Sequence, residues 1–362
     1  MSSPEVLILK ELAHDQPAPG LLGLAERGLL PDTLLRLGVR QQCAARLRAE
    51  SAGGAAAQEA RQQQLLAQLR ASAVALHTAA ANAQHYELPP QFFRLCLGRR
   101  LKYSCAYYAR GDETLDEAEE AMLALYGERA ALADGQEILE LGCGWGSLTL
   151  WMAERYPHAR ICAVSNSVPQ REYIEAQCAR RGLSNVSVQT CDVNRLALPA
   201  ARYDRCVSIE MFEHMRNYET LLARIAAWLR PQGKLFVHVF AHRTLAYPFE
   251  TGGADNWMGR HFFTGGLMPS ADTFLWFQRD LSLDARWLLD GTHYRRTADH
   301  WLANQDARRP EVHEVLAAAY GEARAALWAQ RWRMFFMACA ETFGYAHGRE
   351  WLIAHYRFVR TP

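Results

Sequence analysis

The sequence lacks any surplus of charge of one sign. Its 362 residues contain 40 lysines and arginines against 39 aspartates and glutamates, which leaves a formal net charge of +1. Proteins that bind nucleic acid usually present a strongly basic surface, and anionic membranes attract positively charged proteins. We therefore expect neither a nucleic-acid partner nor a general attraction to a membrane.

Long apolar runs and paired cysteines are also missing. No stretch of about 18 consecutive apolar residues appears, and the segment Met1-Ser-Ser-Pro-Glu-Val6 has no basic start followed by an apolar core. The nine cysteines are scattered without a C-x-x-C pair, which argues against a disulfide framework and against a zinc site. These absences predict a cytoplasmic protein without a signal peptide, a stable membrane insertion or a metal centre.

The chain does contain enough apolar material for a large core, since 50% of its residues are hydrophobic. Residues 1–115 are rich in Ala, Leu, Arg and Gln, and we expect them to form a helical N-terminal region that contributes to the active site. Within this region, the strong helix formers from Ala57 to Ala81 fit a solvated surface helix or a partner surface. We favour the surface helix.

From residue 138 onward the pattern changes to short β-branched segments that alternate with amphipathic helices. This pattern indicates a parallel sheet with crossover helices, and a doubly wound core. A helix that begins at Tyr218 should end at Leu229, before the stop signal Arg230-Pro-Gln-Gly233. The expected strands are 138–141, 160–165, 186–190, 205–209 and 234–240.

The remaining residues divide into further expected regions. The core that binds the cofactor should span residues 116–244, and ligands should lie beyond the carboxyl ends of its strands. Residues 245–310 are rich in aromatics and glycines and are expected to form an insertion that caps the substrate. Residues 311–362 should contain helices followed by a last strand.

The most informative motif is Glu140-Leu-Gly-Cys-Gly-Trp-Gly146, which follows the first expected strand and opens a helix. Gly142, Gly144 and Gly146 permit a tight turn and a close approach to a ligand. Their G-x-G-x-G spacing differs from that of dinucleotide and phosphate loops. Because the acidic Glu140 precedes the glycines, the loop suits S-adenosylmethionine, whose α-amino group seeks a carboxylate or carbonyls. An ordinary strand-to-helix turn is the alternative.

Polar side chains follow the second and third expected strands. We assign Asn166 and Gln170 to the ribose hydroxyls, although Ser165 or Ser167 could simply cap a helix here. Asp192 could accept from the adenine amino group, and its alternative role is that of a turn residue.

Two carboxylates and an imidazole follow the fourth expected strand. Glu210, Glu213 and His214 lie within five residues of one another, directly after buried-strand residues that lead into the cofactor crevice. Histidine can take a proton near neutral pH, and a neighbouring carboxylate would hold its tautomer. An exposed helix could carry the same residues without function, but the position favours an acid/base site.

Several motifs together resemble the superfamily of cyclopropane fatty acid synthases and related S-adenosylmethionine-dependent methyltransferases. They are 101–108, 115–122, the glycine loop, 212–214, 262–270 and 291–294. The chain is most similar to the coclaurine and pavine N-methyltransferase branch, through residues 84–89, 216–219, 277–280 and 343–345. The resemblance implies a Rossmann-like, mostly parallel seven-stranded sheet and a benzylisoquinoline-type amine as methyl acceptor. It leaves a homodimer open.

The resemblance also implies site residues. Tyr103 and Ser104 should contact the methionine part of the cofactor, with Gly142 and Gly144 beneath it. An aliphatic amine is protonated at neutral pH, so carboxylates would attract the ammonium, aromatic rings would hold the hydrocarbon body, and His214 would take the proton. The amine site should be lined by Tyr86, Glu87, Glu210, Glu213 and His214.

A second interpretation stays open, because cyclopropane synthases hold a bicarbonate near the acceptor carbon. The matching ligands here are Cys105, Glu213, His238 and Tyr294, which keeps cyclopropanation of phospholipid acyl chains or carbon methylation as the alternative function. Cys105 and His238 could instead be packing residues, and His242 fits a structural role as well as a substrate contact. The absence of a basic amphipathic segment argues against access to lipid.

A third interpretation is a scaffold protein that retains the fold and uses its N-terminal helices as an interaction surface. The set of Glu210, Glu213 and His214 argues against it. The sequence therefore favours an amine N-methyltransferase.

Overall fold

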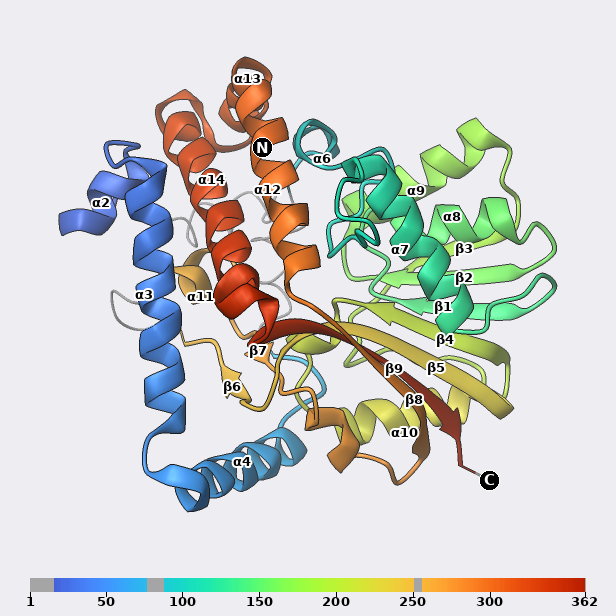
Figure 1. Ribbon diagram of the computed structural model, residues 1–362. Coiled ribbons are helices and arrows are strands. Elements are labelled where there is room, and N and C mark those ends of the chain that lie inside the picture. Colours follow the sequence, from blue (N-terminus) through green and yellow to red (C-terminus); the bar gives the residue numbers. More distant parts are fainter. Residues whose placement is uncertain (1–15, 77–87, 251–255, 362) are drawn as a thin grey trace.

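A seven-stranded sheet forms the centre of the computed structural model, which describes residues 16–76, 88–250 and 256–361 (Figure 1). The sheet order is β3-β2-β1-β4-β5-β9-β8. β1 to β5 pair in parallel, whereas β9 runs antiparallel to both β5 and β8. This arrangement confirms the predicted doubly wound, mostly parallel sheet. The strands are β1 (Glu137–Leu141), β2 (Arg160–Ser165), β3 (Val186–Thr190), β4 (Tyr203–Ile209), β5 (Leu229–His242), β8 (Leu281–Leu289) and β9 (Trp351–Arg360).

Two local predictions were wrong. No strand was expected between residues 245 and 310, yet β8 lies there and forms an edge of the sheet, so this region is only partly an insertion. The helix α10 (Tyr218–Trp228) ends just before the predicted Leu229, because Leu229 already begins β5, and the supposed stop signal lies inside that strand. The region boundaries at 115, 244 and 310 stay predictions.

Helices cover both faces of the sheet. α7 (Leu115–Arg129), α8 (Ser147–Arg155) and α9 (Val168–Arg181) lie on one face, and α10 lies on the other (Figure 1). α7 begins with a capping box, in which Thr114 and Glu117 each bind the other's backbone N–H. Its buried side reaches the sheet, where Tyr126 and the terminal Arg129 contact residues of β5 and β9.

The N-terminal region is helical, as predicted, with α2 (Gly20–Glu26), α3 (Asp32–Ser51), α4 (Gly54–Ala71) and α6 (Pro90–Cys96). α3 lies alongside α14 (Glu322–Gly344), and α12 (Thr292–Ala307) and α13 (Arg309–Tyr320) pack on the same bundle (Figure 1). Only Leu66 and Leu69 of α4 are buried, which supports the surface helix expected there. Between β5 and β8 lie the short elements β6 (Tyr247–Pro248), α11 (Trp257–His261) and β7 (Leu267–Met268).

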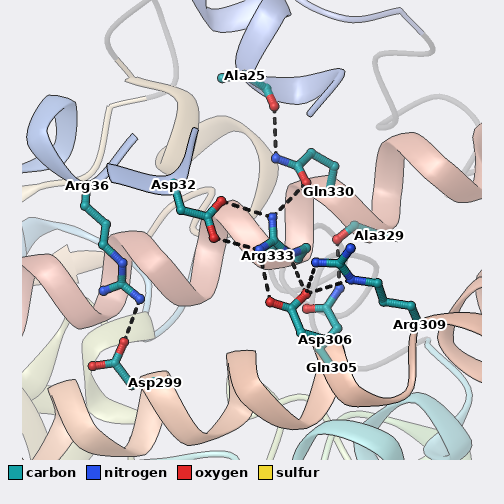
Figure 2. Close-up of polar contacts among 10 residues, drawn as sticks. All are labelled: Ala25, Asp32, Arg36, Asp299, Gln305, Asp306, Arg309, Ala329, Gln330 and Arg333. Atoms are coloured by element: carbon teal, nitrogen blue, oxygen red, sulfur yellow. Dashed lines mark hydrogen bonds and ion pairs between the residues drawn. The ribbon is translucent and has the colours of Figure 1, made fainter. Parts of the chain in front are cut away.

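Ion pairs join the first helices of the chain to the last ones (Figure 2). Arg333 of α14 lies between Asp306 of α12, at 2.6 Å, and Asp32 of α3, at 2.8 Å. Arg36 of α3 makes a further pair with Asp299 at 2.8 Å. Burial favours a higher pKa for the Asp306 carboxyl, but Arg333 outweighs this effect and the pKa lies below its usual value.

The sequence predicted no disulfide framework, no membrane-spanning segment and no metal centre, and the described residues bear on each of these predictions. All nine cysteines are free. Within the described ranges no helix has the length and apolarity needed to cross a bilayer. The same ranges contain no group of three or more His, Cys, Asp or Glu side chains placed to hold a metal ion.

Candidate active site

A cleft lies beyond the carboxyl ends of β1, β2 and β4, where the doubly wound fold places its ligands. The predicted Gly146, Asp192, Cys105, Glu213, His238 and Tyr294 do not line it, and Tyr86 and Glu87 lie outside the described residues. Most of the other predicted site residues do line it: Tyr103, Ser104, Glu140, Gly142, Gly144, Asn166, Gln170, Glu210 and His214.

The three glycines of the loop have different surroundings. All have positive φ, at 78° for Gly142, 51° for Gly144 and 79° for Gly146. A Cβ on Gly144 would meet nothing within 4 Å, so this position faces open space in the cleft. A Cβ on Gly146 would lie 2.7 Å from Ile174 of α9, so the absence of a side chain here permits close packing at the start of α8, and its cofactor contact stays a prediction.

Glu140 is buried at the end of β1 and lines the cleft. Its carboxylate accepts a hydrogen bond from Thr149 of α8. Burial raises the pKa of Glu140 to about 8, and the Thr149 hydroxyl only partly opposes this rise. A cationic group bound nearby would favour the ionised carboxylate, so the residue fits the α-amino group predicted for it.

Three buried polar atoms of the cleft lack a hydrogen-bond partner among the described residues. They are Trp145 Nε1, Ser147 Oγ and Gln170 Nε2. Buried polar groups are nearly always paired in folded proteins, so these atoms fit a polar ligand such as S-adenosylmethionine. Gln170 Oε1 accepts from Ser165 Oγ at 2.7 Å, and this contact leaves the amide nitrogen for the ligand.

Two polar residues that follow β2 and β3 have structural contacts. Ser167 caps α9, as the alternative assignment held. Asp192 accepts from the backbone N–H of Asn194 at 2.8 Å, which is a turn contact, while its neighbours Cys191 and Val193 line the cleft. The ribose role of Asn166 and the adenine role of Asp192 stay predictions.

Glu210 is the centre of the polar groups in the site. Its Oε1 accepts from the backbone N–H of Cys105 and from His238 Nε2, both at 3.0 Å, and its Oε2 accepts from the Tyr294 hydroxyl at 2.8 Å. Burial raises the pKa of the Glu210 carboxyl, and the strongest opposing effect is the charge of Lys102. Glu210 has a φ of 48°, which is uncommon for a residue other than glycine. In this conformation its carboxylate reaches His238 of β5 and Tyr294 of α12.

Glu213 has quite different surroundings. It is completely buried, and its Oε1 accepts only a long contact of 3.3 Å from the N–H of Phe240. Its Oε2 has no partner within the described part of the chain. Burial and then the charge of Glu210 raise the pKa of Glu213 well above its usual value, and the few hydrogen bonds to its carboxyl oppose this rise only in part, so the protonated form is favoured.

His214 lines the cleft and stacks on the Phe263 ring, with centroids 5.4 Å apart and planes inclined by 5°. Burial lowers the pKa of His214 to about 4, and Arg216 lowers it further, while Glu210 acts in the opposite direction. The imidazole is therefore neutral at pH 7 and retains one nitrogen that can accept a proton.

Comparison with known proteins places this site in a family. The family model for mycolic acid cyclopropane synthetases matches residues 75–348. The chain belongs to this family. It is 40% identical over 344 residues to (S)-coclaurine N-methyltransferase of Thalictrum flavum subsp. glaucum. The aligned region covers 94% of the chain and 95% of that protein.

Further members of the cyclopropane synthetase family extend the comparison. The chain is 28% identical over 231 residues to the cyclopropane-fatty-acyl-phospholipid synthase of Escherichia coli strain K12, covering 63% and 57% of the two chains. A crystal structure of coclaurine N-methyltransferase bound to N-methylheliamine and SAH matches with a TM-score of 0.88 and 38% identity, over 98% of this chain and 99% of that one. The chain is therefore an S-adenosylmethionine-dependent methyltransferase, as its sequence predicts.

The ligands of the alternative bicarbonate site can be placed in the structure. The resemblance left open that Cys105, Glu213, His238 and Tyr294 surround a bicarbonate. The structure brings three of them together around the carboxylate of Glu210, whereas Glu213 bonds to the backbone of β5 instead. Three of the four residues thus share a carboxylate of the protein as their partner.

Several residues of the site were missed by sequence reasoning. Lys102 lines the cleft and donates to Ser104 Oγ at 2.5 Å and to the carbonyl of Cys105 at 2.6 Å. Burial lowers the pKa of Lys102 to about 8, against the charge of Glu210. A lone lysine between Leu101 and Tyr103 gives no sequence signal of such burial. His242 accepts from the backbone N–H groups of Thr244 and Leu245, which supports its structural alternative.

Proposed function

We propose that this methyltransferase transfers a methyl group to the nitrogen of a small amine of the benzylisoquinoline or tetrahydroisoquinoline type. The position of the Glu210 carboxylate carries the proposal. Three hydrogen bonds hold this carboxylate beside the cleft, where in its ionised form it would attract and orient an ammonium group. The similarity to coclaurine N-methyltransferase over nearly the whole chain supports the same acceptor class.

The same carboxylate argues against a bicarbonate-dependent reaction. Cys105 N–H, His238 and Tyr294 already donate to Glu210. A second anion at this point would have to share those donors and would be repelled by a buried negative charge. Cyclopropanation of a lipid, which needs the external anion, is therefore disfavoured.

S-adenosylmethionine fits the residues of the cleft and, when bound, supplies an electrophilic methyl group. Glu140 would face its α-amino group, Tyr103 and Ser104 its methionine part, and Gln170 and Asn166 its ribose. Gly144 leaves the space that a close approach requires. The unpartnered nitrogen of Gln170 is the observation that favours the ribose assignment.

The acceptor must lose a proton before its nitrogen has a lone pair, and we assign this proton to His214. The ring is neutral at pH 7, lines the cleft and is near enough to Glu210 for their charges to interact. A pKa of about 4 makes it a weak base toward an ammonium in water. The same burial also lowers the pKa of an ammonium in the site, because desolvation penalises both cations. The difference between the pKa of the bound ammonium and the pKa of His214 is therefore smaller than if only the histidine were buried.

The two carboxylates then have separate roles. Burial raises the pKa of Glu210, but its three hydrogen bonds and the nearby Lys102 favour the ionised form, in which it would attract and orient the ammonium. Glu213, whose pKa is raised, stays protonated and avoids a second buried negative charge beside it. Phe263 stacks on His214 and so holds the imidazole ring in place.

The decisive experiment incubates the protein with methyl-labelled S-adenosylmethionine and a panel of secondary amines and unsaturated phospholipids. We expect label in N-methylated tetrahydroisoquinolines and none in lipid. The Glu210→Gln variant, which keeps the size of the side chain but removes its charge, should lose most of this activity while it still binds the cofactor. Methylene addition to phospholipid without amine methylation would overturn the proposal.

A further inference from the structure

A line of hydrogen bonds continues from Glu210 across the sheet, beyond the residues that the reaction itself requires. His238 Nε2 contacts Glu210 Oε1 at 3.0 Å, and the other nitrogen of His238, Nδ1, lies 2.8 Å from His355 Nε2. His355 Nδ1 in turn lies 2.7 Å from Nη1 of Arg129. His238 of β5 and His355 of β9 are directly opposed in the sheet register, and Arg129 is the last residue of α7.

The contact with Arg129 determines which atom donates in each hydrogen bond of this line. A guanidinium has only donors, so His355 Nδ1 must accept from Arg129. A neutral imidazole with an accepting Nδ1 carries its hydrogen on Nε2, and His355 therefore donates to His238 Nδ1. By the same rule His238 carries its hydrogen on Nε2 and donates it to Glu210. The reverse order would place two donors against each other at the Arg129 end.

Both histidines are neutral, as this argument requires. Neither ring has any exposed area. Burial lowers the pKa of His238 well below its usual value, and the charges of Lys102 and Arg129 lower it further. Burial, His238, Arg129 and Lys102 do the same to the pKa of His355. Neither ring is therefore a doubly protonated cation that could donate from both nitrogens.

The Tyr126 hydroxyl also contacts His238 Nδ1, at 2.9 Å. It does not decide the direction, because a hydroxyl can donate or accept and Tyr126 also interacts with Ser104. Arg129 can only donate, and an ionised Glu210 at the other end of the line can only accept, so both ends require the same direction.

We propose that Arg129 and His355 are positioning residues that fix the tautomer of His238, so that its Nε2–H always faces the Glu210 carboxylate. With the other tautomer, an imidazole lone pair would face the carboxylate and one of its donors would be lost. The predicted effect on turnover rests on the proposed function. The predicted tautomers do not, because they can be measured in the protein without substrate. Arg129 thus acts on Glu210 only through His355 and His238.

The test replaces Arg129 in two ways. Arg129→Met removes the donor and keeps an unbranched side chain, and Arg129→Lys restores a donor that cannot accept. Arg129 also lies over the Trp287 ring, at 5.1 Å, so a control must remove a similar contact without touching the line. Arg357 lies over the same ring at 5.5 Å and donates to Asp284 and to the backbone carbonyl of Arg129. Arg357→Met is therefore the control, because it removes the ring contact and leaves the Arg129 guanidinium beside His355.

Nitrogen-15 NMR of histidine-labelled protein reports which nitrogen of each ring carries hydrogen. In the wild type and in Arg357→Met we expect both His238 and His355 as the Nε2–H tautomer. In Arg129→Met we expect a mixture of tautomers and a turnover number about 10–100-fold lower, as for other partners that orient functional histidines. The melting temperature should stay close to that of Arg357→Met, and Arg129→Lys should recover a single tautomer and most of the turnover.

Two results would overturn the proposal. One is an Nδ1–H tautomer of His238 in the wild type, and the other is an unchanged tautomer and turnover in a folded Arg129→Met protein. If the tautomers behave as expected but the protein methylates no amine, the proposed function fails and the positioning role of Arg129 and His355 stands. The two failures are therefore distinguishable.

Discussion

The Tyr294 hydroxyl donates a hydrogen bond to Glu210 Oε2 at 2.8 Å and so connects α12 to the residue that follows β4. The two residues are 84 positions apart in the sequence. The contact is buried, and together with Cys105 N–H and His238 it gives the Glu210 carboxylate a single orientation. Three segments that are distant along the chain therefore determine where the site carries its negative charge.

Tyr294→Phe should lower the turnover number by about 10–100-fold, because a hydrogen bond to a buried charge is worth about 1.5–3 kcal/mol. Steady-state kinetics with an active amine would measure this, and cofactor affinity should hardly change. Tyr203→Phe is the control, since Tyr203 is also a buried tyrosine but lies at the start of β4, away from the Glu210 carboxylate. Equal losses in both variants would contradict a role for the Tyr294 contact.

Gly144→Val should abolish binding of S-adenosylmethionine, because the added side chain would fill the open space that Gly144 leaves in the cleft. Isothermal titration calorimetry measures the affinity directly. Gly182→Val controls for backbone strain, since Gly182 has a φ of 67° with open space around it and lies outside the cleft. Normal affinity in the Gly144 variant would remove the loop from the cofactor site.

Asp192→Ala should weaken cofactor binding by about 1–3 kcal/mol, the usual effect of leaving a buried polar partner unpaired. The same calorimetric titration measures it. Because Asp192 also accepts from Asn194 N–H, the melting temperature of the variant must be compared with that of the wild type. An unchanged affinity would leave Asp192 as a turn residue only.

His214→Ala should lower turnover by about 10²–10⁴-fold with cofactor affinity nearly intact, as expected for loss of a general base. The pKa of His214 is lowered to about 4, so the wild-type ring becomes a cation, and the base is lost, only as the pH falls toward that value. Any rise in rate through neutral and mildly basic pH should therefore follow the ammonium of the substrate. His313→Ala, at a largely exposed histidine of α13, should leave the whole pH profile unchanged.

Removal of bicarbonate from the buffer and Cys105→Ala should both leave most of the activity in place. Cys105 contacts Glu210 through its backbone N–H, which alanine retains, and its thiol points to the carbonyl of Ala106. Rates in degassed, carbonate-free buffer with and without added bicarbonate give the measurement. A strong dependence on bicarbonate would show that Glu210 does not replace the external anion.

Arg333→Met should lower the free energy of unfolding by about 1–3 kcal/mol, because Asp306 and Asp32 lose their shared partner. Since the pKa of Asp306 is lowered in the folded state, its contribution is present above the unfolded pKa of about 3.9 and is lost as the pH falls through the folded pKa. Denaturant unfolding of wild type and variant should therefore differ at neutral pH and converge in acid. Arg309→Met, at a more exposed arginine that also pairs with Asp306, should cost less.

The sequence predicts the parallel part of the sheet well, because buried parallel strands are short, β-branched and bounded by turns. It did not predict β8, whose residues Leu281 to Leu289 alternate between half-buried and exposed positions and lie at an edge. Such a strand depends on pairing with β9, which is a tertiary contact without a local signal.

In the candidate site, several of the residues that the sequence singled out line the cleft, but their partners could not be predicted. It could not show that Glu210, rather than Glu213, meets His238 and Tyr294, because this depends on the positive φ of a residue other than glycine. The line through His355 and Arg129 was missed for a related reason. His355 lies in a strand where its alternation with apolar neighbours resembles an ordinary core position, and only the register with β5 brings it to His238.

The place of β9 in the sheet has a consequence for biosynthesis. β9 is the last strand along the chain, yet it lies between β5 and β8 rather than at an edge. While the ribosome is still translating the region before Trp351, β5 has no neighbour on that side and β8 has no strand to pair with. The nascent protein therefore carries two open strand edges until residues 351–360 emerge, and His355 reaches His238 only at that moment. The sheet and the hydrogen bonds from Glu210 to Arg129 therefore cannot form before β9 has been synthesised.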